Sequence, residues 1–214
     1  IPEYTGGLTI APAGFKAGDS YRPDPYADEK PILVINQSNL AEHKDKLTAA
    51  TAELVKRYPD FKVDVFKTHR SVWLPKANLD NTKLNAVSAR TSNEGLGIEN
   101  ALPGVPFPIP QTGNEAMWNH LVRYNGVTIT SKYDSWNVDS TGTPILATTG
   151  LGFVNSPTYE DRSRVLGPKD IFYRIKLYYT GPARRAGEAV LVQDAVNPVI
   201  QPRRAWQYLP GQRR

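Results

Sequence analysis

Alternation of apolar and polar residues dominates the second half of this chain. The clearest instance is residues 171–179, where Arg174 and Lys176 lie between apolar or aromatic residues at every second position: Ile171, Tyr173, Ile175, Leu177 and Tyr179. A period of two is typical of a β-strand, because successive side chains point to opposite faces. Four other stretches have strand-like sequences: 127–133, 143–154, 187–194 and 203–209. Short turns join them, so we predict an antiparallel sheet from about residue 126 to the C-terminus.

The part of the chain before residue 126 contains two helical patterns. Apolar residues recur at helical spacing between Leu40 and Tyr58, with Ser38 as the predicted N-cap and Pro59 as the stop. A second helix is predicted at 115–124, where one stripe holds three apolar or aromatic residues and Asn114 is the predicted cap: Met117, Leu121 and Tyr124.

Short strands are also predicted in this part of the chain. Residues 61–66 alternate and indicate a strand, and the apolar run at 32–35 indicates a strand or a docked segment.

Two segments are too rich in proline and glycine for a helix or a central strand. Residues 1–32 are predicted to be extended, irregular and pinned to a surface by buried side chains: Tyr4, Leu8, Phe15 and Tyr21. Residues 103–110 are either a ligand for an SH3-type domain or a rigid strap on their own domain. Phe107 and Ile109 face the same way in an extended chain, which favours the strap.

These elements predict an α+β fold in which a curved antiparallel sheet packs on helices. We expect a single domain over residues 1–214, with three parts. An extended arm covers 1–35; helices, one strand and the proline-rich strap cover 36–125; antiparallel strands cover 126–214.

The composition narrows the chemistry. The chain contains no cysteine, which excludes disulfides, cysteine nucleophiles and cysteine-ligated metals. It contains three histidines, and none has the spacing of a metal site, since Glu115 and His120 are not three or four residues apart. Neither a phosphate-binding glycine loop nor a Gly-x-Ser-x-Gly elbow is present. The sequence therefore predicts a non-enzyme without cofactor or metal.

The net charge of +5 is concentrated near the C-terminus, where residues 184–214 hold six arginines in three pairs: Arg184–Arg185, Arg203–Arg204 and Arg213–Arg214. Solvated strand ends, a partner or anionic surface, and single-stranded nucleic acid stacked on neighbouring aromatics are the alternatives. No RNA-binding signature accompanies the pairs, and adjacent strand residues point to opposite faces, so nucleic acid is not the predicted partner. No run of about 18 apolar residues indicates a membrane-spanning helix.

A set of motifs across nearly the whole chain resembles the DUF1329 family of bacterial proteins. They occur in this order: Ile1-Pro-Glu-Tyr4-Thr-Gly6-Gly7-Leu8, Asp24-Pro25-Tyr-Ala-Asp28-Glu29-Lys30-Pro31, Arg57-Tyr58-Pro59-Asp60, Pro106-Phe-Pro108-Ile-Pro110, Glu115-Ala-Met117-Trp118-Asn119-His120, Ala183-Arg184-Arg185-Ala186-Gly187 and Trp206-Gln-Tyr208-Leu-Pro210-Gly211-Gln-Arg213-Arg214. Each motif is weak alone, and their number and order carry the resemblance.

The resemblance implies a periplasmic protein of Gram-negative bacteria that is made with a signal peptide. It implies kinship with the LolA/LolB lipoprotein-carrier fold, a half-barrel wrapped around helices over an apolar cavity. It also implies association with outer-membrane proteins or RND-type exporters. Family chains continue past the motif that ends at Arg214, so we expect an incomplete sheet whose remaining C-terminal part belongs to a longer chain.

From these expectations we derive a carrier hypothesis, in which the protein binds and hands off a hydrophobic or lipid-like molecule without catalysis. The predicted apolar site combines the helix at 115–124 with one face of the strand at 171–179: Trp118, Leu121, Tyr173, Ile175, Leu177 and Tyr179. Five apolar positions in a row need a cover, either a ligand or the protein's own helices. The alternative function is a scaffold subunit that docks to an outer-membrane protein or exporter.

Overall fold

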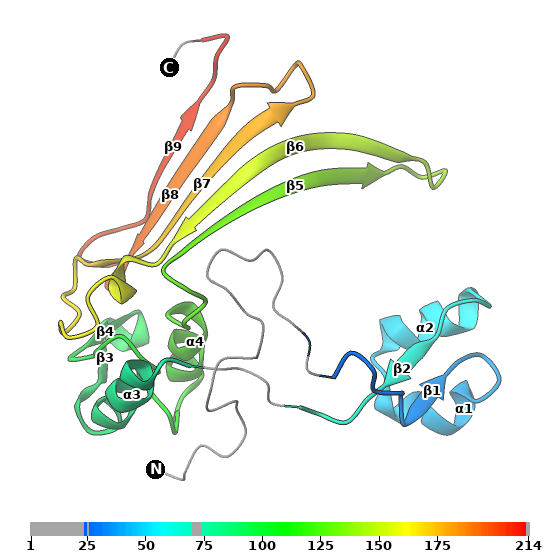
Figure 1. Ribbon diagram of the computed structural model, residues 1–214, viewed down its shortest axis with the longest axis horizontal. Coiled ribbons are helices and arrows are strands. Elements are labelled where there is room, and N and C mark those ends of the chain that lie inside the picture. The colour runs from blue at the N-terminus through cyan, green and yellow to red at the C-terminus, as the bar shows by residue number, and fades with distance from the viewer. Residues whose placement is uncertain (1–23, 25, 70–73, 213–214) are drawn as a thin grey trace. The chain divides into compact units, whose positions relative to one another are not determined.

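The computed structural model describes residues 24, 26–69 and 74–212 (Figure 1). The chain divides into two compact units, with the boundary between Trp73 and Leu74, and each unit is described by itself. The predicted burial of Tyr4, Leu8, Phe15 and Tyr21 lies outside the described residues. The single domain over 1–214 stays a prediction.

The N-terminal unit pairs two short strands, β1 (Leu33–Ile35) and β2 (Val63–Val65), antiparallel to each other. The strand at 61–66 was predicted, and the run at 32–35, predicted as a strand or a docked segment, is a strand. The predicted single helix is instead three segments: α1 (Leu40–His43), the 3₁₀ turn η1 (Lys44–Lys46) and α2 (Ala49–Arg57).

The break between these segments lies at Leu47 and Thr48, which both have extended backbone. Thr48 starts α2 because its side chain accepts a hydrogen bond from the Thr51 amide at 3.2 Å. Ser38 does not cap α1, since its hydroxyl donates to Asn36 Oδ1 at 2.7 Å instead. A local capping residue therefore divided a stretch whose apolar spacing alone predicted one helix.

The second unit contains a five-stranded antiparallel sheet, as predicted. Its strands are β5 (Thr128–Val138), β6 (Pro144–Asn155), β7 (Ile171–Gly181), β8 (Ala189–Ala195) and β9 (Arg204–Tyr208). Each strand pairs with the next in the chain, so within the described residues β5 and β9 are the two edges and the sheet is not a closed barrel. Figure 1 shows that β5 and β6 are long and curved and that the strands of the sheet splay away from one end.

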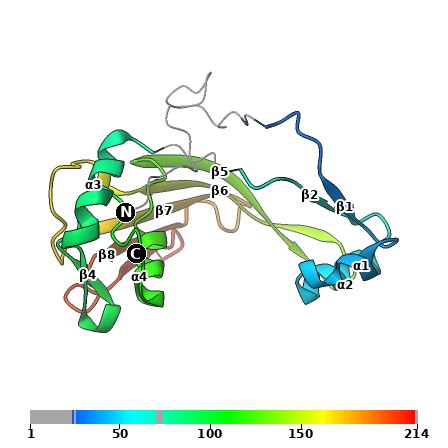
Figure 2. The ribbon, with the colours of Figure 1, turned by 90° about the horizontal axis from the view of Figure 1, so that it is seen from below.

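Helices and short strands gather at the end of the sheet where β7 begins (Figures 1 and 2). They are α3 (Lys76–Ser88), β3 (Arg90–Ser92), the 3₁₀ turn η2 (Asn93–Gly95), β4 (Gly97–Glu99), α4 (Gly113–Leu121) and the 3₁₀ turn η3 (Pro157–Tyr159). The core lies here and is formed by nine buried apolar residues: Ala89, Ile98, Ala101, Phe107, Trp118, Val122, Leu166, Phe172 and Val196.

Helix α4 confirms a helix in the predicted place, although it ends at Leu121 rather than Tyr124 and its cap is Thr112 rather than Asn114. The Thr112 hydroxyl accepts from the Glu115 amide at 3.2 Å, and the Glu115 carboxylate accepts from the Gln111 amide. This reciprocal arrangement resembles a capping box and fixes where the helix begins.

The proline-rich strap is held by asparagine side chains. Asn85 of α3 bonds Leu102 through both its amide and its carbonyl, and it also donates to the Val105 carbonyl. Asn119 of α4 bonds the amide and carbonyl of Phe107 in the same way. These amides replace the backbone partners that a proline-rich chain cannot find in a sheet. Phe107 is buried as predicted, whereas Ile109 is 57% exposed and does not pack.

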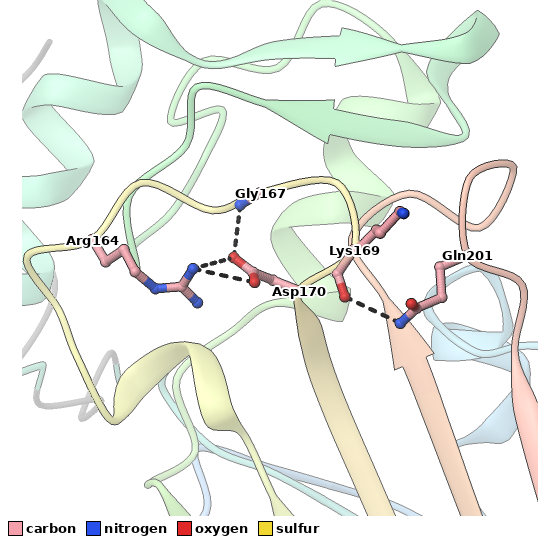
Figure 3. A network of polar contacts seen from close by, with 5 residues as sticks. All are labelled: Arg164, Gly167, Lys169, Asp170 and Gln201. Carbon is pink, nitrogen blue, oxygen red and sulfur yellow. Dashed lines mark hydrogen bonds and ion pairs between the residues drawn. The ribbon is translucent and has the colours of Figure 1, made fainter.

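The loop before β7 is fixed by Asp170, as Figure 3 shows. Its carboxylate accepts from the Gly167 amide at 2.7 Å and pairs with Arg164 at 2.9 Å. Gln201, in the β8–β9 connection, donates to the Lys169 carbonyl at 3.1 Å. The loop before β7 and the β8–β9 connection are therefore joined by the Gln201 side chain.

The β5–β6 turn depends on ionised Asp139, whose carboxylate accepts from the Thr141 hydroxyl and from the Thr141 and Thr143 amides. These bonds, the hydroxyl first, lower the pKa of Asp139 below its usual 3.8. The turn's contribution is thus present above that value and lost as pH falls through the lower, folded pKa. We expect the Thr141 and Thr143 amide NMR shifts to titrate below pH 3.8. In Asp139→Asn they should not titrate, and a midpoint at or above the usual value contradicts the assignment.

Candidate functional site

Three tyrosines mark one face of the five-stranded sheet, which we call the tyrosine face: Tyr133, Tyr173 and Tyr179. The strand register places Tyr133 opposite Gly150 and Gly150 opposite Tyr179. Between this row and the row of Tyr173 lie two rows that we call the apolar rows. Their apolar side chains are Ile129, Val154, Ile175 and Val192 in one row, and Leu177 and Val190 in the other. All of them except Ile129 are half-buried.

Glycines in β6 shape the middle of the tyrosine face. A Cβ atom on Gly150 would lie 2.8 Å from the Tyr133 hydroxyl, and one on Gly152 would lie 2.9 Å from the Ser131 hydroxyl and 3.7 Å from a Leu177 methyl. Side chains of β5 and β7 therefore lean over the β6 backbone. Any larger residue at Gly150 would push Tyr133 away from the sheet.

At the Tyr179 end of the tyrosine face lies an arginine whose charge a carboxylate neutralises. The Arg185 guanidinium lies over the Tyr179 ring, 4.4 Å from its centroid. It donates to one oxygen of Glu188 from Nε at 3.2 Å and from Nη2 at 2.9 Å. Burial first, and then nearby Tyr179, raises the pKa of Tyr133, while Arg185 opposes the rise. The phenol of Tyr133 therefore stays a neutral hydrogen-bonding group.

At the Tyr173 end of the tyrosine face lies a second arginine–carboxylate pair. Tyr173 lies opposite Asp194 in the β7–β8 register. Asp194 accepts two hydrogen bonds from Arg203, at 2.6 and 2.8 Å, in a bidentate pair. Each polar end of the face thus combines a tyrosine with an arginine whose charge a carboxylate balances.

The structure brings four of the six predicted site residues together. Tyr173, Ile175, Leu177 and Tyr179 share the tyrosine face. Ile171 does not continue the row, because a bulge between Ile171 and Tyr173 gives them adjacent partners, Ala195 and Asp194, which point to opposite faces. The expected run of five same-face residues is therefore a run of four.

The two predicted site residues on α4 lie elsewhere. Trp118 is 5% exposed, packs edge-to-face on Phe172 and donates from its indole to the Gly95 carbonyl at 3.0 Å. Leu121 is 43% exposed. Only Tyr173 of the tyrosine face packs against the core that contains Trp118.

The opposite face of the sheet is basic and aromatic, with four exposed cations: Lys132, Arg174, Lys176 and Arg204. Lys176 lies over the Phe153 ring and Arg204 over the Trp206 ring, 6.0 and 5.9 Å from the centroids. A hollow of about 150 Å³ beside Trp206 is lined by residues of β7, β8 and β9. Arg203 and Arg204 point to opposite faces, as the alternation rule requires, and the Arg213–Arg214 pair lies outside the described residues.

Sequence analysis missed both ion pairs of the tyrosine face. The three-residue spacing of Arg185 and Glu188 was a signal for one of them. The Asp194–Arg203 pair spans the β8–β9 connection and follows only from the register.

Two larger hollows lie beside α3, of about 560 and 440 Å³, one of them along the proline-rich strap. They are open and carry no cluster of titratable groups beyond Arg90 and Glu115. In the described part of the chain, no three His, Asp or Glu side chains are arranged to hold a metal ion. None of its helices has the length and apolar character needed to span a membrane.

Comparison with known proteins gives two matches. The DUF1329 family, described as proteins of unknown function, matches residues 34–214. The uncharacterized protein PA3922 of Pseudomonas aeruginosa is 36% identical over 215 residues, which cover 100% of this chain and 47% of that protein. The chain thus spans about half the length of this relative. No solved structure matches the chain.

Proposed function

We propose, for a chain that belongs to the DUF1329 family, that it binds and hands on a hydrophobic or lipid-like molecule on the tyrosine face of its sheet, without catalysis. We place this activity in the periplasm, in transport across the cell envelope. In this proposal the curved open sheet is the half-barrel of a LolA-like carrier.

One observation carries the proposal: apolar side chains line the tyrosine face outside the buried core of this unit. Ile175, Leu177, Val190 and Val192 occupy adjacent positions on β7 and β8 and are half-buried rather than buried. The helices of this unit lie at the end of the sheet where β7 begins (Figures 1 and 2). Covering this surface with an apolar ligand gains about 25 cal/mol for each Å² removed from water.

Binding of this kind fits a carrier. The hydrophobic effect is non-directional, so a ligand held by aliphatic side chains slides and leaves without breaking specific bonds. Hand-off then needs only a partner that offers the ligand a larger apolar surface.

Replacing Leu177 with Trp tests the proposed site. Leu177 lies in the middle of the apolar rows, so the larger indole should fill the surface that the ligand needs. We expect Leu177→Trp to abolish uptake of the neutral hydrophobic dye Nile red and to change the melting temperature little. Fluorescence titration and thermal unfolding measure the two effects.

Leu191→Trp is the matched control, because Leu191 lies on the neighbouring strand and on the opposite face of the sheet. It should leave dye uptake intact. If Leu177→Trp instead costs about 1–3 kcal/mol of stability, the position belongs to a packed interior and the open-face assignment is wrong. Native mass spectrometry of protein from its own periplasm, followed by lipid extraction, would identify the natural ligand.

The exposed end of the β5–β6 hairpin favours scaffolding as a second candidate function. It presents three large apolar residues that are each at least half-exposed, with Trp136 and Val138 on one face and Ile145 on the other. Exposed apolar side chains on both faces of a hairpin end suit a protein partner in the envelope, such as an outer-membrane protein or an exporter. If the wild-type protein takes up no hydrophobic probe, the carrier proposal fails and scaffolding replaces it.

A further inference from the structure

The two ends of the tyrosine face set the chemistry of its ligand. At each end a tyrosine stands beside an arginine, and in both cases a carboxylate binds that arginine: Arg185 with Glu188, and Arg203 with Asp194. Arg203 binds both oxygens of Asp194 in the strong bidentate arrangement, whereas Arg185 directs two nitrogens at one oxygen of Glu188. Neither end therefore offers an uncompensated positive charge to a ligand.

The charges of the sheet are segregated by face. The opposite face keeps Lys132, Arg174, Lys176 and Arg204 exposed, and in the described residues none of them has a carboxylate partner. The tyrosine face places paired charges and phenols around aliphatic rows. Glu188 and Asp194 are well shielded, with side chains 16% and 15% exposed, and they already occupy donors of Arg185 and Arg203, so a ligand carboxylate would find little net attraction there.

The distance between the two polar ends also bears on the ligand. Tyr173 and Tyr179 lie six positions apart on one strand, which corresponds to roughly 20 Å at 3.3 Å per residue. One leaflet of a bilayer core is about 15 Å thick, and this is the depth that a single acyl chain fills. The face between Tyr173 and Tyr179 is long enough for one such chain lying along the strands across the apolar rows, with a polar group at its end reaching a tyrosine.

We propose that the ligand of the tyrosine face is an uncharged single-chain amphiphile, such as a long-chain alcohol or ester, and that the face discriminates against fatty acid anions. This inference rests on the proposed function. The hydroxyl of Tyr133 or Tyr179 bonds the polar group of the ligand. Glu188 acts as the selective element, because it occupies the arginine that would otherwise bind a carboxylate.

Displacement of Nile red by hexadecanol and by palmitate tests the inference on the whole chain. The wild-type protein should bind hexadecanol at least about tenfold more tightly than palmitate. Glu188→Gln frees Arg185, and a hydrogen bond to a charged group then becomes available to palmitate. We expect this variant to bind palmitate about tenfold more tightly than the wild type does and to leave hexadecanol unchanged.

Two variants control the experiment. Arg185→Gln combined with Glu188→Gln removes both charges, so it should keep the preference of the wild type. Any displacement of Nile red that remains in Leu177→Trp comes from the basic opposite face, and it is subtracted from the wild-type signal. If Glu188→Gln does not fold, Asp194→Asn frees Arg203 at the other end and gives the same comparison.

The outcomes separate the two proposals. Equal or tighter binding of palmitate by the wild type overturns the neutral-ligand inference and leaves the carrier function standing. An unchanged ratio of affinities in folded Glu188→Gln also overturns it. If the wild type binds neither compound nor the dye, the carrier function itself fails, and this inference with it.

Discussion

Replacing Trp118 with Ala should lower the free energy of unfolding of the sheet-bearing unit by about 3–5 kcal/mol, which is the usual cost of truncating a buried Trp. Trp118 is 5% exposed and packs edge-to-face on Phe172, with ring centroids 5.6 Å apart. Its loss opens a cavity between α4 and the start of β7 and also leaves the Gly95 carbonyl without its indole donor. Urea unfolding followed by far-ultraviolet circular dichroism measures the change.

Leu121→Ala on the same helix is the control, because Leu121 is 43% exposed and should cost less than about 1 kcal/mol. Dye uptake then distinguishes a residue of the packed core from a residue of the ligand site. Under conditions where both variants are folded, we expect both to bind Nile red as the wild type does. Retained stability with lost uptake in Trp118→Ala would return Trp118 to the ligand site, where sequence reasoning had placed it.

The period of two predicted the sheet because packing on the two faces depends on the alternation of apolar and polar residues. That alternation can be read from neighbouring residues in the sequence. The positions of Tyr173, Ile175, Leu177 and Tyr179 on one face follow from this pattern alone. The bulge at Phe172 does not, because the extra residue is defined by its partners on β8, Asp194 and Ala195. That bulge moves Ile171 out of the row, and Phe172 joins the core.

Helix α3 was missed because its buried residues are polar. Asn78 and Asn85 are 2% and 1% exposed, so the buried stripe of this helix shows no hydrophobic period. The proline-rich strap explains the need for asparagine, since its backbone groups have few other partners. Local propensity cannot reveal that requirement, because Asn85 and Leu102 are brought together only by the folded chain.

The ion pairs of the tyrosine face were missed for a related reason. The three arginine pairs stood out in the sequence as excess charge, yet Arg185 and Arg203 are each neutralised by an acidic residue that looked ordinary. Charge counting along the chain cannot show which charges meet. The register of β7, β8 and β9 decides it, and with it the character of the candidate site.

Replacing Asn85 with Leu should destabilise the same unit by about 3–4 kcal/mol, since three backbone groups of the strap lose their partner and each buried unpaired group costs about 1 kcal/mol or more. These groups are the amide and carbonyl of Leu102 and the carbonyl of Val105, at 2.7, 2.9 and 3.2 Å from the Asn85 side chain. Urea unfolding again measures the loss.

Asn78→Leu provides a matched comparison on the same helix. Asn78 is as deeply buried as Asn85, but neither polar atom of its side chain has a hydrogen-bond partner among the described residues. Replacing unpaired polar atoms with apolar ones of similar shape should be neutral or stabilising. We therefore expect the two substitutions to differ by at least about 3 kcal/mol, although they exchange the same residues at equal burial. Equal losses at both positions would mean that crowding by the leucine methyls, rather than hydrogen bonding to the strap, sets the cost.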